Sequence, residues 1–188
     1  MLKLQVIIAS TRPSRKGPIV ADWIYERAQQ SADFEVELID LAEVNLPLFD
    51  ESNHPRLQKY EHEHTLRWSA IVERADAFIF VTPEYNYGAP PSLVNALTYL
   101  SKEWSYKPAA FVSYGGVSGG TRSVQMCKQS LTTLGVMPIP QAVSIPFFTK
   151  HIDSESNQFV AEDIQNKSAD TVLKELARWA QALKGMRT

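Results

Sequence analysis

Short apolar runs alternate with segments of helical periodicity along nearly the whole chain, and this alternation constrains the fold more than any other feature. The run at 77–82, AFIFVT, is typical of a buried strand, whereas residues 18–30 place their apolar side chains at helical spacing. The pattern predicts strands at 3–8, 34–41, 77–82, 109–114 and 136–145, and helices near 18–30, 66–74, 92–104, 121–134 and 169–183. Because a parallel crossover needs a connection of helix length, we expect a three-layer α/β fold, in which helices cover both faces of a doubly wound, five-stranded parallel sheet.

Composition narrows the possible classes of protein. The 188 residues fit a single domain, 1–188, and 44% of them are hydrophobic, which is enough for a core without disulfides or metal. Lys and Arg number 19 against 21 acids, a formal charge of −2, so we expect no nucleic-acid partner. We also expect no membrane span, because no window comes near the roughly 20 apolar residues that one requires, and the first apolar run reads as a strand and not as a signal peptide. Cys127 is the single cysteine and cannot form an internal disulfide, which agrees with a cytoplasmic protein.

Three unusual loops leave predicted strands and open predicted helices. In a doubly wound sheet, ligands bind beyond the carboxyl ends of the strands, near the point where the strand order reverses. The three loops are ASTRPSRKGP at 9–18, TPEYNYGAPP at 82–91 and SYGGVSGGTR at 113–122. We therefore expect them to meet at one edge of the sheet and to form the binding site.

The first loop indicates a phosphate site. It combines hydroxyl groups and cations just before a helix, where unpaired N–H groups and the helix dipole favour an anion. Its candidate ligand-binding residues are Ser10, Thr11, Arg12, Arg15, Lys16 and Gly17. The loop matches neither G-x-x-x-x-G-K-[ST] nor G-x-G-x-x-G, so a phosphomonoester such as flavin mononucleotide (FMN) suits it better than ATP or a dinucleotide. The simpler interpretation is a helix start with solvated cations.

The second and third loops indicate a planar ligand. Tyr85 and Asn86 offer an aromatic face and an amide, and Gly88 permits a close approach of the backbone. In the third loop, four glycines within six residues allow the main chain to present N–H groups to a flat ring. Taken alone, the third loop is equally compatible with a flexible loop before a capped helix. A structural turn would account for the prolines and Gly88 of the second loop, but not for Tyr85 and Tyr87 with Asn86 between them.

The motifs resemble those of the NADPH-dependent FMN reductase family, whose members include quinone, chromate and azo-dye reductases. The segment TPEYNYGAPPSLVNALTYLS resembles the P-E-Y-N segment of that family, ASTRPSRKG its G-S-x-R phosphate loop, and SYGGVSGG its glycine-rich flavin loop. Ala9 stands where the family usually has glycine, so the entry to the phosphate loop is expected to be arranged differently.

The resemblance implies a flavodoxin-like fold that binds FMN and is reduced by NADPH or NADH. By position it places the phosphate on the first loop, from Ser10 to Gly17. It places the isoalloxazine ring against two groups of residues: Pro83, Glu84, Tyr85 and Asn86 on one side, and Ser113, Tyr114, Gly115 and Gly116 on the other. It further implies a homodimer or homotetramer, with the helix at 91–104 as the expected contact. An isologous dimer there would let Tyr87 or Trp104 border the partner's site.

The expected activity is hydride transfer from the nicotinamide nucleotide through FMN to a quinone or a similar small-molecule acceptor, or to FMN itself. Because the chemistry belongs to the cofactor, we assign no catalytic side chain. Two alternatives are a flavodoxin-like electron carrier without NAD(P)H turnover and a nucleotide-binding regulatory module. The carrier usually presents an acidic docking face, of which the interspersed charges give little sign.

Four other residues have simpler expected roles. Glu84 is expected to be a surface acid paired with a cation, and Cys127 a small buried hydrophobe. His62 and His64 are two residues apart and would point in different directions on a helix, and no cysteine or third histidine lies within a few residues of them in the sequence, so we expect no metal site there.

Overall fold

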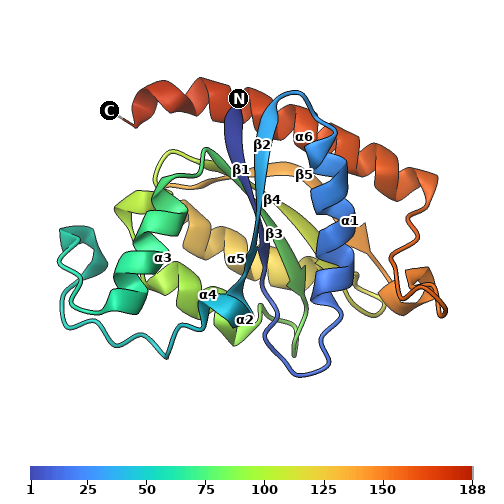
Figure 1. Cartoon of the computed structure of the whole chain (residues 1–188), viewed down its shortest axis with the longest axis horizontal. Helices are drawn as coiled ribbons and strands as arrows, with labels where there is room; N and C mark the ends of the chain where they lie inside the picture. Colours follow the sequence, from blue (N-terminus) through green and yellow to red (C-terminus); the bar gives the residue numbers. More distant parts are fainter. Residues whose placement is uncertain (188) are drawn as a thin grey trace.

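The computed structural model describes residues 1–187 and has the predicted three-layer architecture. Five parallel strands form one sheet in the order β2-β1-β3-β4-β5. Helices lie on both faces of this sheet (Figure 1). The strand order reverses between β1 and β3, so the loops that leave their carboxyl ends diverge and open a crevice there. The predicted fold class is confirmed.

Strands and helices alternate along the chain, with short 3-10 turns in several of the connections. The strands are β1 (Leu2–Ile8), β2 (Phe34–Asp40), β3 (Ala77–Pro83), β4 (Pro108–Tyr114) and β5 (Met137–Ile145). The α-helices are α1 (Gly17–Gln29), α2 (Leu41–Val44), α3 (Glu63–Glu73), α4 (Pro91–Thr98), α5 (Thr121–Thr133) and α6 (Asp163–Leu183). The 3-10 turns are η1 (Pro55–Leu57), η2 (Lys102–Trp104), η3 (Phe148–His151) and η4 (Lys184–Met186).

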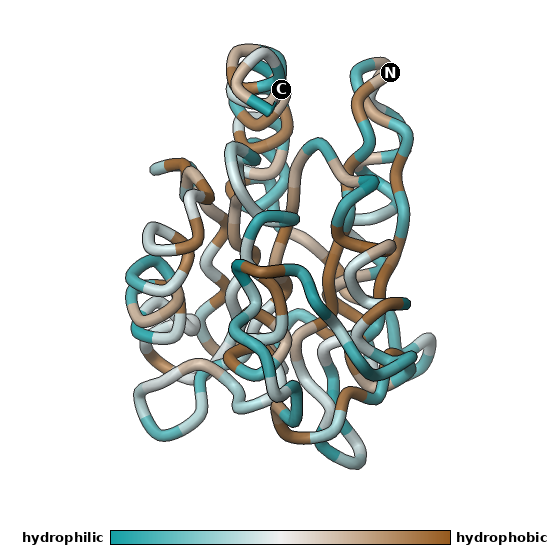
Figure 2. Tube along the Cα trace, turned by 90° about the vertical axis from the view of Figure 1, so that its left-hand side faces the viewer, coloured by the Kyte–Doolittle hydropathy of each residue, from teal (hydrophilic) through white to brown (hydrophobic). Residues whose placement is uncertain are grey.

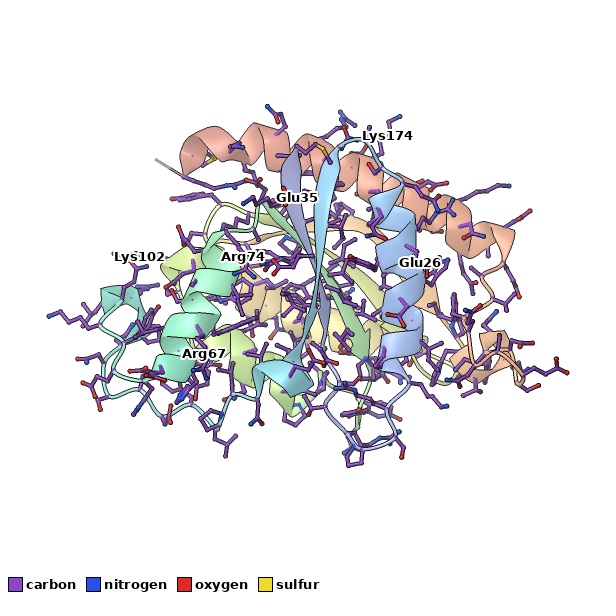
Figure 3. The ribbon with its side chains drawn as sticks, in the orientation of Figure 1. Glu26, Glu35, Arg67, Arg74, Lys102 and Lys174 are labelled. Carbon is purple, nitrogen blue, oxygen red and sulfur yellow. The ribbon has the colours of Figure 1, made fainter. Side chains whose placement is uncertain are left out.

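Two hydrophobic clusters form the core, one on each face of the sheet. Helices α1 and α6 cover one face, and α3, α4 and α5 cover the other. Neighbouring residues of the central strands alternate between the clusters: on β3, Ile79 faces α1 and α6, whereas Phe80 faces the opposite helices. The central strands are apolar on both faces, as parallel strands covered by helices must be (Figure 2). The six charged side chains labelled in Figure 3 are exposed: Glu26, Glu35, Arg67, Arg74, Lys102 and Lys174.

Two predicted helices have different bounds in the structure. The predicted helix at 92–104 ends as α4 at Thr98, because the chain turns to bury both Tyr99 and Trp104 in the core. Helix α6 begins six residues before the predicted start, at Asp163. A reciprocal cap between Glu162 and Gln165 sets that start: the backbone N–H of Glu162 donates to Gln165 Oε1 at 2.8 Å.

Trp104 corrects an expectation about assembly. Its side chain is fully buried in the chain's own core, against Trp68 and Phe78, and so it does not border a partner's site. Tyr87, the other residue named for that role, is 72% exposed.

Within residues 1–187, no helix combines the length and the apolar composition that a membrane crossing requires.

Candidate functional site

The three motif loops meet at the carboxyl edge of the sheet, the lower edge in Figure 1. They surround a cavity of about 230 Å³, to which each loop contributes residues. Ten residues line it: Arg12, Arg15, Lys16, Pro83, Glu84, Tyr85, Tyr114, Gly115, Gly116 and Phe148. Nine of these were predicted from the sequence; Phe148, from the segment after β5, was not.

The loop between β1 and α1 packs tightly around its helix start. Ser10 is buried, and the hydroxyl of Tyr114 lies 3.3 Å from Ser10 Oγ. A methyl group at Gly17 would stand 2.3 Å from Ser10 Oγ and 2.8 Å from the Tyr114 hydroxyl, so this position needs glycine. The positive φ in the loop falls on Ser14, at 59°, and not on Ala9, which explains how alanine is tolerated there. The helix N-terminus therefore has a cradle of small and hydroxyl-bearing groups.

The predicted phosphate-binding cations have different surroundings. Arg15 forms an ion pair with Asp40 and also donates to the Ser10 carbonyl at 2.9 Å. Lys16 Nζ lies 3.3 Å from Asn157 Oδ1. The Arg12 guanidinium lies 5.8 Å from the centre of the Tyr85 ring and forms no ion pair within residues 1–187. Among residues 1–187, Arg15 alone of these three cations is paired with an acid, so the charges of Arg12 and Lys16 are left for a ligand.

Thr11 points away from this group of residues. It lines a second cavity of about 410 Å³ on the other side of the loop, together with residues of α2 and α4. The structure therefore brings the predicted residues of the first loop together, except for Thr11.

The loop after β3 contains a tight reverse turn. Backbone hydrogen bonds join Tyr85 and Gly88 in both directions, at 3.0 and 2.8 Å. The two residues between them, Asn86 and Tyr87, have φ angles of 49° and 68°. Positive φ at both central positions is the mark of a type I′ turn. The expected special conformation of this loop thus falls on Asn86 and Tyr87 and not on Gly88, and it leaves both side chains at the surface.

Glu84 is buried, not at the surface. Its side chain is 8% exposed, and its carboxylate accepts hydrogen bonds from Ser118 and Arg122. The predicted pairing with a cation is confirmed, with Arg122 Nη1 lying 2.7 Å from Glu84 Oε1. Burial alone would raise the pKa of Glu84, but the hydrogen bonds from Arg122 and Ser118 hold this pKa below its usual value. Glu84 is therefore ionised at neutral pH.

The glycine-rich loop after β4 is fixed at several points. Buried Ser113 donates its hydroxyl to the Gly119 carbonyl at 2.8 Å, and Gly119 and Gly120 have φ angles of 58° and 82°. The backbone N–H of Gly115 bonds the carbonyl of Ile145 at 3.2 Å, so it is occupied within the fold. Gly116 is open, because an added methyl group would meet nothing within 4 Å. Of the two glycines predicted to contact a ligand, Gly116 is the accessible one.

Sequence reasoning missed three residues of this site: Asp40, Arg122 and Phe148. Asp40 ends β2, which is the neighbour of β1, so an acid at that strand end was a usable signal. Arg122 lies in the first turn of α5, next to the glycine-rich loop. Phe148 packs on Tyr114 with a distance of 4.9 Å between ring centres, but its segment carries no motif.

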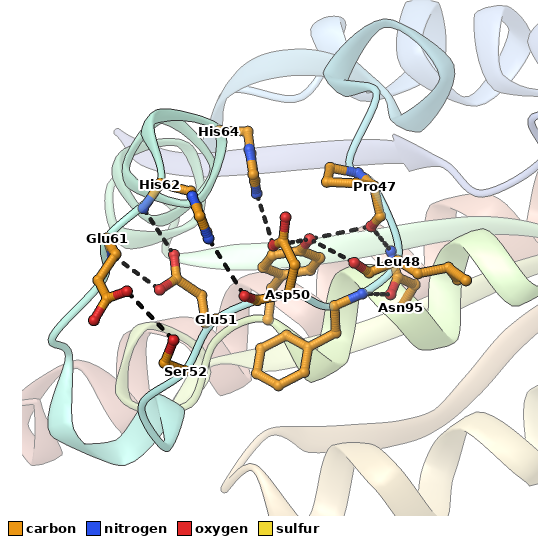
Figure 4. A network of polar contacts seen from close by, with 11 residues as sticks. Pro47, Leu48, Asp50, Glu51, Ser52, Glu61, His62, His64 and Asn95 are labelled. Carbon is orange, nitrogen blue, oxygen red and sulfur yellow. Dashed lines mark hydrogen bonds and ion pairs between the residues drawn. The ribbon is translucent and has the colours of Figure 1, made fainter.

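The two histidines belong to a different network (Figure 4). Their rings stack with centres 5.1 Å apart, so the prediction that they diverge is wrong. The reason is that His62 precedes α3 in an extended conformation and is not on the helix. His64 Nε2 lies 3.0 Å from Asp50 Oδ1, which also accepts from the Tyr99 hydroxyl at 2.9 Å. This network fastens the long segment before α3 to the helices.

Cys127 is buried as predicted, and burial raises the pKa of its thiol to about 12.

The profile of the NADPH-dependent FMN reductase family matches residues 2–150. The chain belongs to this family. An NAD(P)H-dependent FMN reductase of Schizosaccharomyces pombe is 37% identical over 147 residues, which cover 77% of this chain and 74% of the relative. A quinone reductase of Pseudomonas putida is 32% identical, covering 73% and 74% of the two chains. The predicted class, an NAD(P)H-dependent FMN-using reductase, is confirmed by these matches.

Solved structures show the same fold. The flavoenzyme NAD(P)H:acceptor oxidoreductase of Paracoccus denitrificans superposes with a TM-score of 0.73 at 20% identity, over 97% of this chain and 98% of its own. A flavodoxin of Streptococcus pneumonia TIGR4 gives 0.57 at 11% identity, over 94% and 98%. At these identities the likeness concerns the fold alone, and it confirms the flavodoxin-like prediction.

Proposed function

We propose that this chain is an FMN-dependent NAD(P)H oxidoreductase that passes electrons to quinones or similar small acceptors. The observation that carries the proposal is the cavity at the carboxyl edge of the sheet. It joins a glycine-dependent helix start, two cations, Arg12 and Lys16, without an ion-pair partner among residues 1–187, an aromatic wall and an open glycine. The helix start suits a phosphate group, and the cationic side chains suit its negative charge. The aromatic wall suits a planar ring, and the open glycine suits the edge of that ring.

Each loop would hold one part of FMN. Arg12 and Lys16 line the cavity. We propose that they hold the phosphate together with Ser10 and Gly17 at the helix start, and that Arg15 supports the loop through the Ser10 carbonyl. Thr11 borders the same loop from its other side and would act through the backbone. For the ring, we propose two walls: Pro83, Glu84, Tyr85 and Asn86, facing Ser113, Tyr114, Gly115 and Gly116. Buried Ser113 and Tyr114 would shape the second wall, and Gly116 would approach the ligand directly.

When bound, FMN supplies the hydride-accepting and electron-donating chemistry. The chain's own residues position the cofactor, exclude water and set the local charge. Glu84 is the carboxylate among the residues that line the cavity, and its oxygens are engaged by Ser118 and Arg122. We therefore assign no acid, base or nucleophile to the side chains around the cavity. We also assign no residue to the choice between NADPH and NADH.

We further propose that residues 1–188 form a single FMN-binding domain that assembles into a homodimer or homotetramer in the cytoplasm. Two large apolar side chains next to the site support assembly, since Tyr87 is 72% exposed and Met126 is 45% exposed. A buried, unpaired Cys127 agrees with a reducing compartment. Analytical ultracentrifugation would test the oligomeric state.

An equilibrium titration with FMN, followed by steady-state assays with NADPH and a benzoquinone, tests the proposed function. We expect saturable FMN binding, quenching of the flavin fluorescence, and NADPH oxidation that depends on both FMN and the quinone. Binding without NADPH oxidation would instead favour the electron carrier. Absence of FMN binding would contradict both functions.

A further inference from the structure

Glu84 lies in the wall of the cavity, yet its carboxylate is directed to the helix that follows the glycine-rich loop. Glu84 Oε2 accepts from the backbone N–H of Arg122 at 3.1 Å and from Ser118 Oγ at 2.9 Å. Glu84 Oε1 accepts from Arg122 Nη1 at 2.7 Å. All three donors belong to the segment that leaves β4, 34 and 38 residues away in the chain. One carboxylate thus joins two loops of the site.

This contact supplies the cap that α5 cannot provide for itself. The residue at the N-cap position of α5 is Gly120, which has no side chain. A helix start leaves backbone N–H groups unpaired, and an anion there is favoured by both hydrogen bonding and the helix dipole. Because Glu84 bonds the N–H of Arg122, the second residue of α5, it takes the place of a local capping residue.

The segment before α5 needs such a restraint. It carries glycine at 115, 116, 119 and 120, and a chain rich in glycine loses much conformational entropy when it is fixed. Its first half is held from β5 and beyond, since the N–H groups of Phe147 and Phe148 bond the carbonyls of Gly116 and Gly115 at 3.0 and 3.3 Å. Its second half is held at the Gly119 carbonyl by the hydroxyls of Ser113 and Ser144, and at Ser118 and Arg122 by Glu84.

Arg122 extends the same contact to the reverse turn after β3. Its guanidinium lies 4.2 Å from the centre of the Tyr87 ring, a distance typical of a cation–π interaction. Glu84 at one end of the turn and Tyr87 within it are therefore both held by one arginine from the opposite wall. The ion pair thereby fixes the separation of the two walls that would enclose a flat ring.

We propose that Glu84 is a positioning residue for the flavin: it caps α5 from the neighbouring loop and holds the glycine-rich loop in its ligand-receiving shape. This inference rests on the proposed function and makes the role of Glu84 indirect. The ordered loop presents Gly116 to the ring without a further entropy cost at binding, so losing the carboxylate weakens FMN binding.

Two variants, Glu84→Ala and Glu84→Gln, test the proposal. Alanine removes all three hydrogen bonds, whereas glutamine keeps one carbonyl oxygen as an acceptor for the N–H of Arg122. Glu37→Ala is the matched control, because Glu37 also pairs with an arginine, Arg74, but lies on β2 away from the cavity. A general loss of stability would appear in the control as well.

The first measurement is amide hydrogen exchange of the protein without added flavin. In Glu84→Ala, peptides covering residues 115–124 should exchange about five to ten times faster, which is the range that loss of a helix cap implies. Glu84→Gln should be intermediate, and Glu37→Ala should leave these peptides unchanged. Unchanged exchange in Glu84→Ala would overturn the capping role whether or not the protein binds flavin.

The second measurement compares the dissociation constant of FMN with turnover at saturating FMN. We expect the Glu84→Ala constant to rise about tenfold, with partial recovery in Glu84→Gln and no change in Glu37→Ala. A maximal rate that falls at least a hundredfold with unchanged FMN affinity would overturn the proposal and assign Glu84 to the chemistry. Wild-type protein that binds no FMN would contradict the proposed function, whereas the exchange result would still decide the capping role.

Discussion

Arg15 and Asp40 form a bidentate ion pair that joins the loop after β1 to the end of β2. The two terminal nitrogens of Arg15 contact the two carboxylate oxygens of Asp40, and the side chains are only 20% and 12% exposed. The same guanidinium donates to the carbonyl of Ser10 at 2.9 Å. Arg15, which the sequence indicates as a phosphate ligand, therefore has its charge balanced within the protein and orients the loop.

Replacing Asp40 with alanine should destabilise the fold. The change leaves a partly buried guanidinium without its partner, and it removes the cap that Asp40 gives to the N–H of Ala42 at 2.9 Å. We expect a loss of about 3 kcal/mol in the free energy of unfolding, measured by urea denaturation. The control is Asp170→Ala, which breaks the more exposed pair with Arg27 and should cost less than about 1 kcal/mol. Equal losses would show that the Arg15–Asp40 pair is only a surface contact.

Replacing Arg12 with alanine should weaken the binding of FMN much more than the binding of riboflavin. Arg12 lines the cavity without an ion-pair partner in the described part of the chain, so a phosphate dianion is its expected partner. Its loss should weaken FMN binding about tenfold or more and riboflavin binding only slightly, as measured by quenching of flavin fluorescence. Similar weakening of both flavins would remove Arg12 from the phosphate site.

The substitutions Gly17→Ala and Gly116→Ala form a matched pair, because each adds one methyl group to a glycine of the site. Alanine at Gly17 would place its methyl group 2.3 Å from Ser10 Oγ, and the loop would have to shift. Gly17→Ala should therefore cost about 1–3 kcal/mol of stability and also weaken FMN binding. Gly116→Ala meets no atom within 4 Å and should leave stability within about 0.5 kcal/mol of wild type. Thermal unfolding and FMN titration of both variants check the prediction, which a stable Gly17→Ala protein with normal affinity would refute.

Lys107 should make stability depend on pH in the alkaline range. Its buried ammonium donates to the carbonyls of Val72 and Glu73, at the end of α3, and burial lowers the pKa of Lys107 to about 8. The unfolded chain, with a lysine pKa of about 10.4, binds more protons between these two values, so stability rises with pH across that window. Urea unfolding should show wild type gaining up to about 3 kcal/mol relative to Lys107→Met between about pH 7.5 and about pH 10. Parallel pH profiles of the two proteins would contradict the lowered pKa.

The sheet and its loops were readable from the sequence because they depend on local patterns. Apolar runs such as Ala77–Pro83 would be apolar on both faces of a strand, and only a strand covered on both sides suits them. The three motif loops could be placed together because parallel strands end at one edge. The end of α4 could not be read in this way, since helical spacing continues to Trp104 and only packing of Tyr99 and Trp104 decides where the chain turns.

Within the site, residue types were predictable but their partners were not. The sequence showed three cations in the first loop, but it did not show that Asp40, at the end of another strand, forms an ion pair with Arg15. It placed Glu84 in a ring-contacting motif, but the donors of its carboxylate lie in a loop more than 30 residues away. Long-range pairing of charged side chains leaves no period or spacing in a single sequence, so tertiary structure was needed to assign these roles.

Anaerobic rapid mixing of the FMN-loaded protein with NADPH tests the central claim most directly. We predict that the oxidised flavin absorbance bleaches in a single fast phase and returns when a benzoquinone is added, with one quinone reduced per flavin. Flavin that stays bound and oxidised in the presence of both NADPH and NADH would contradict the assignment of this site as an NAD(P)H-dependent reductase.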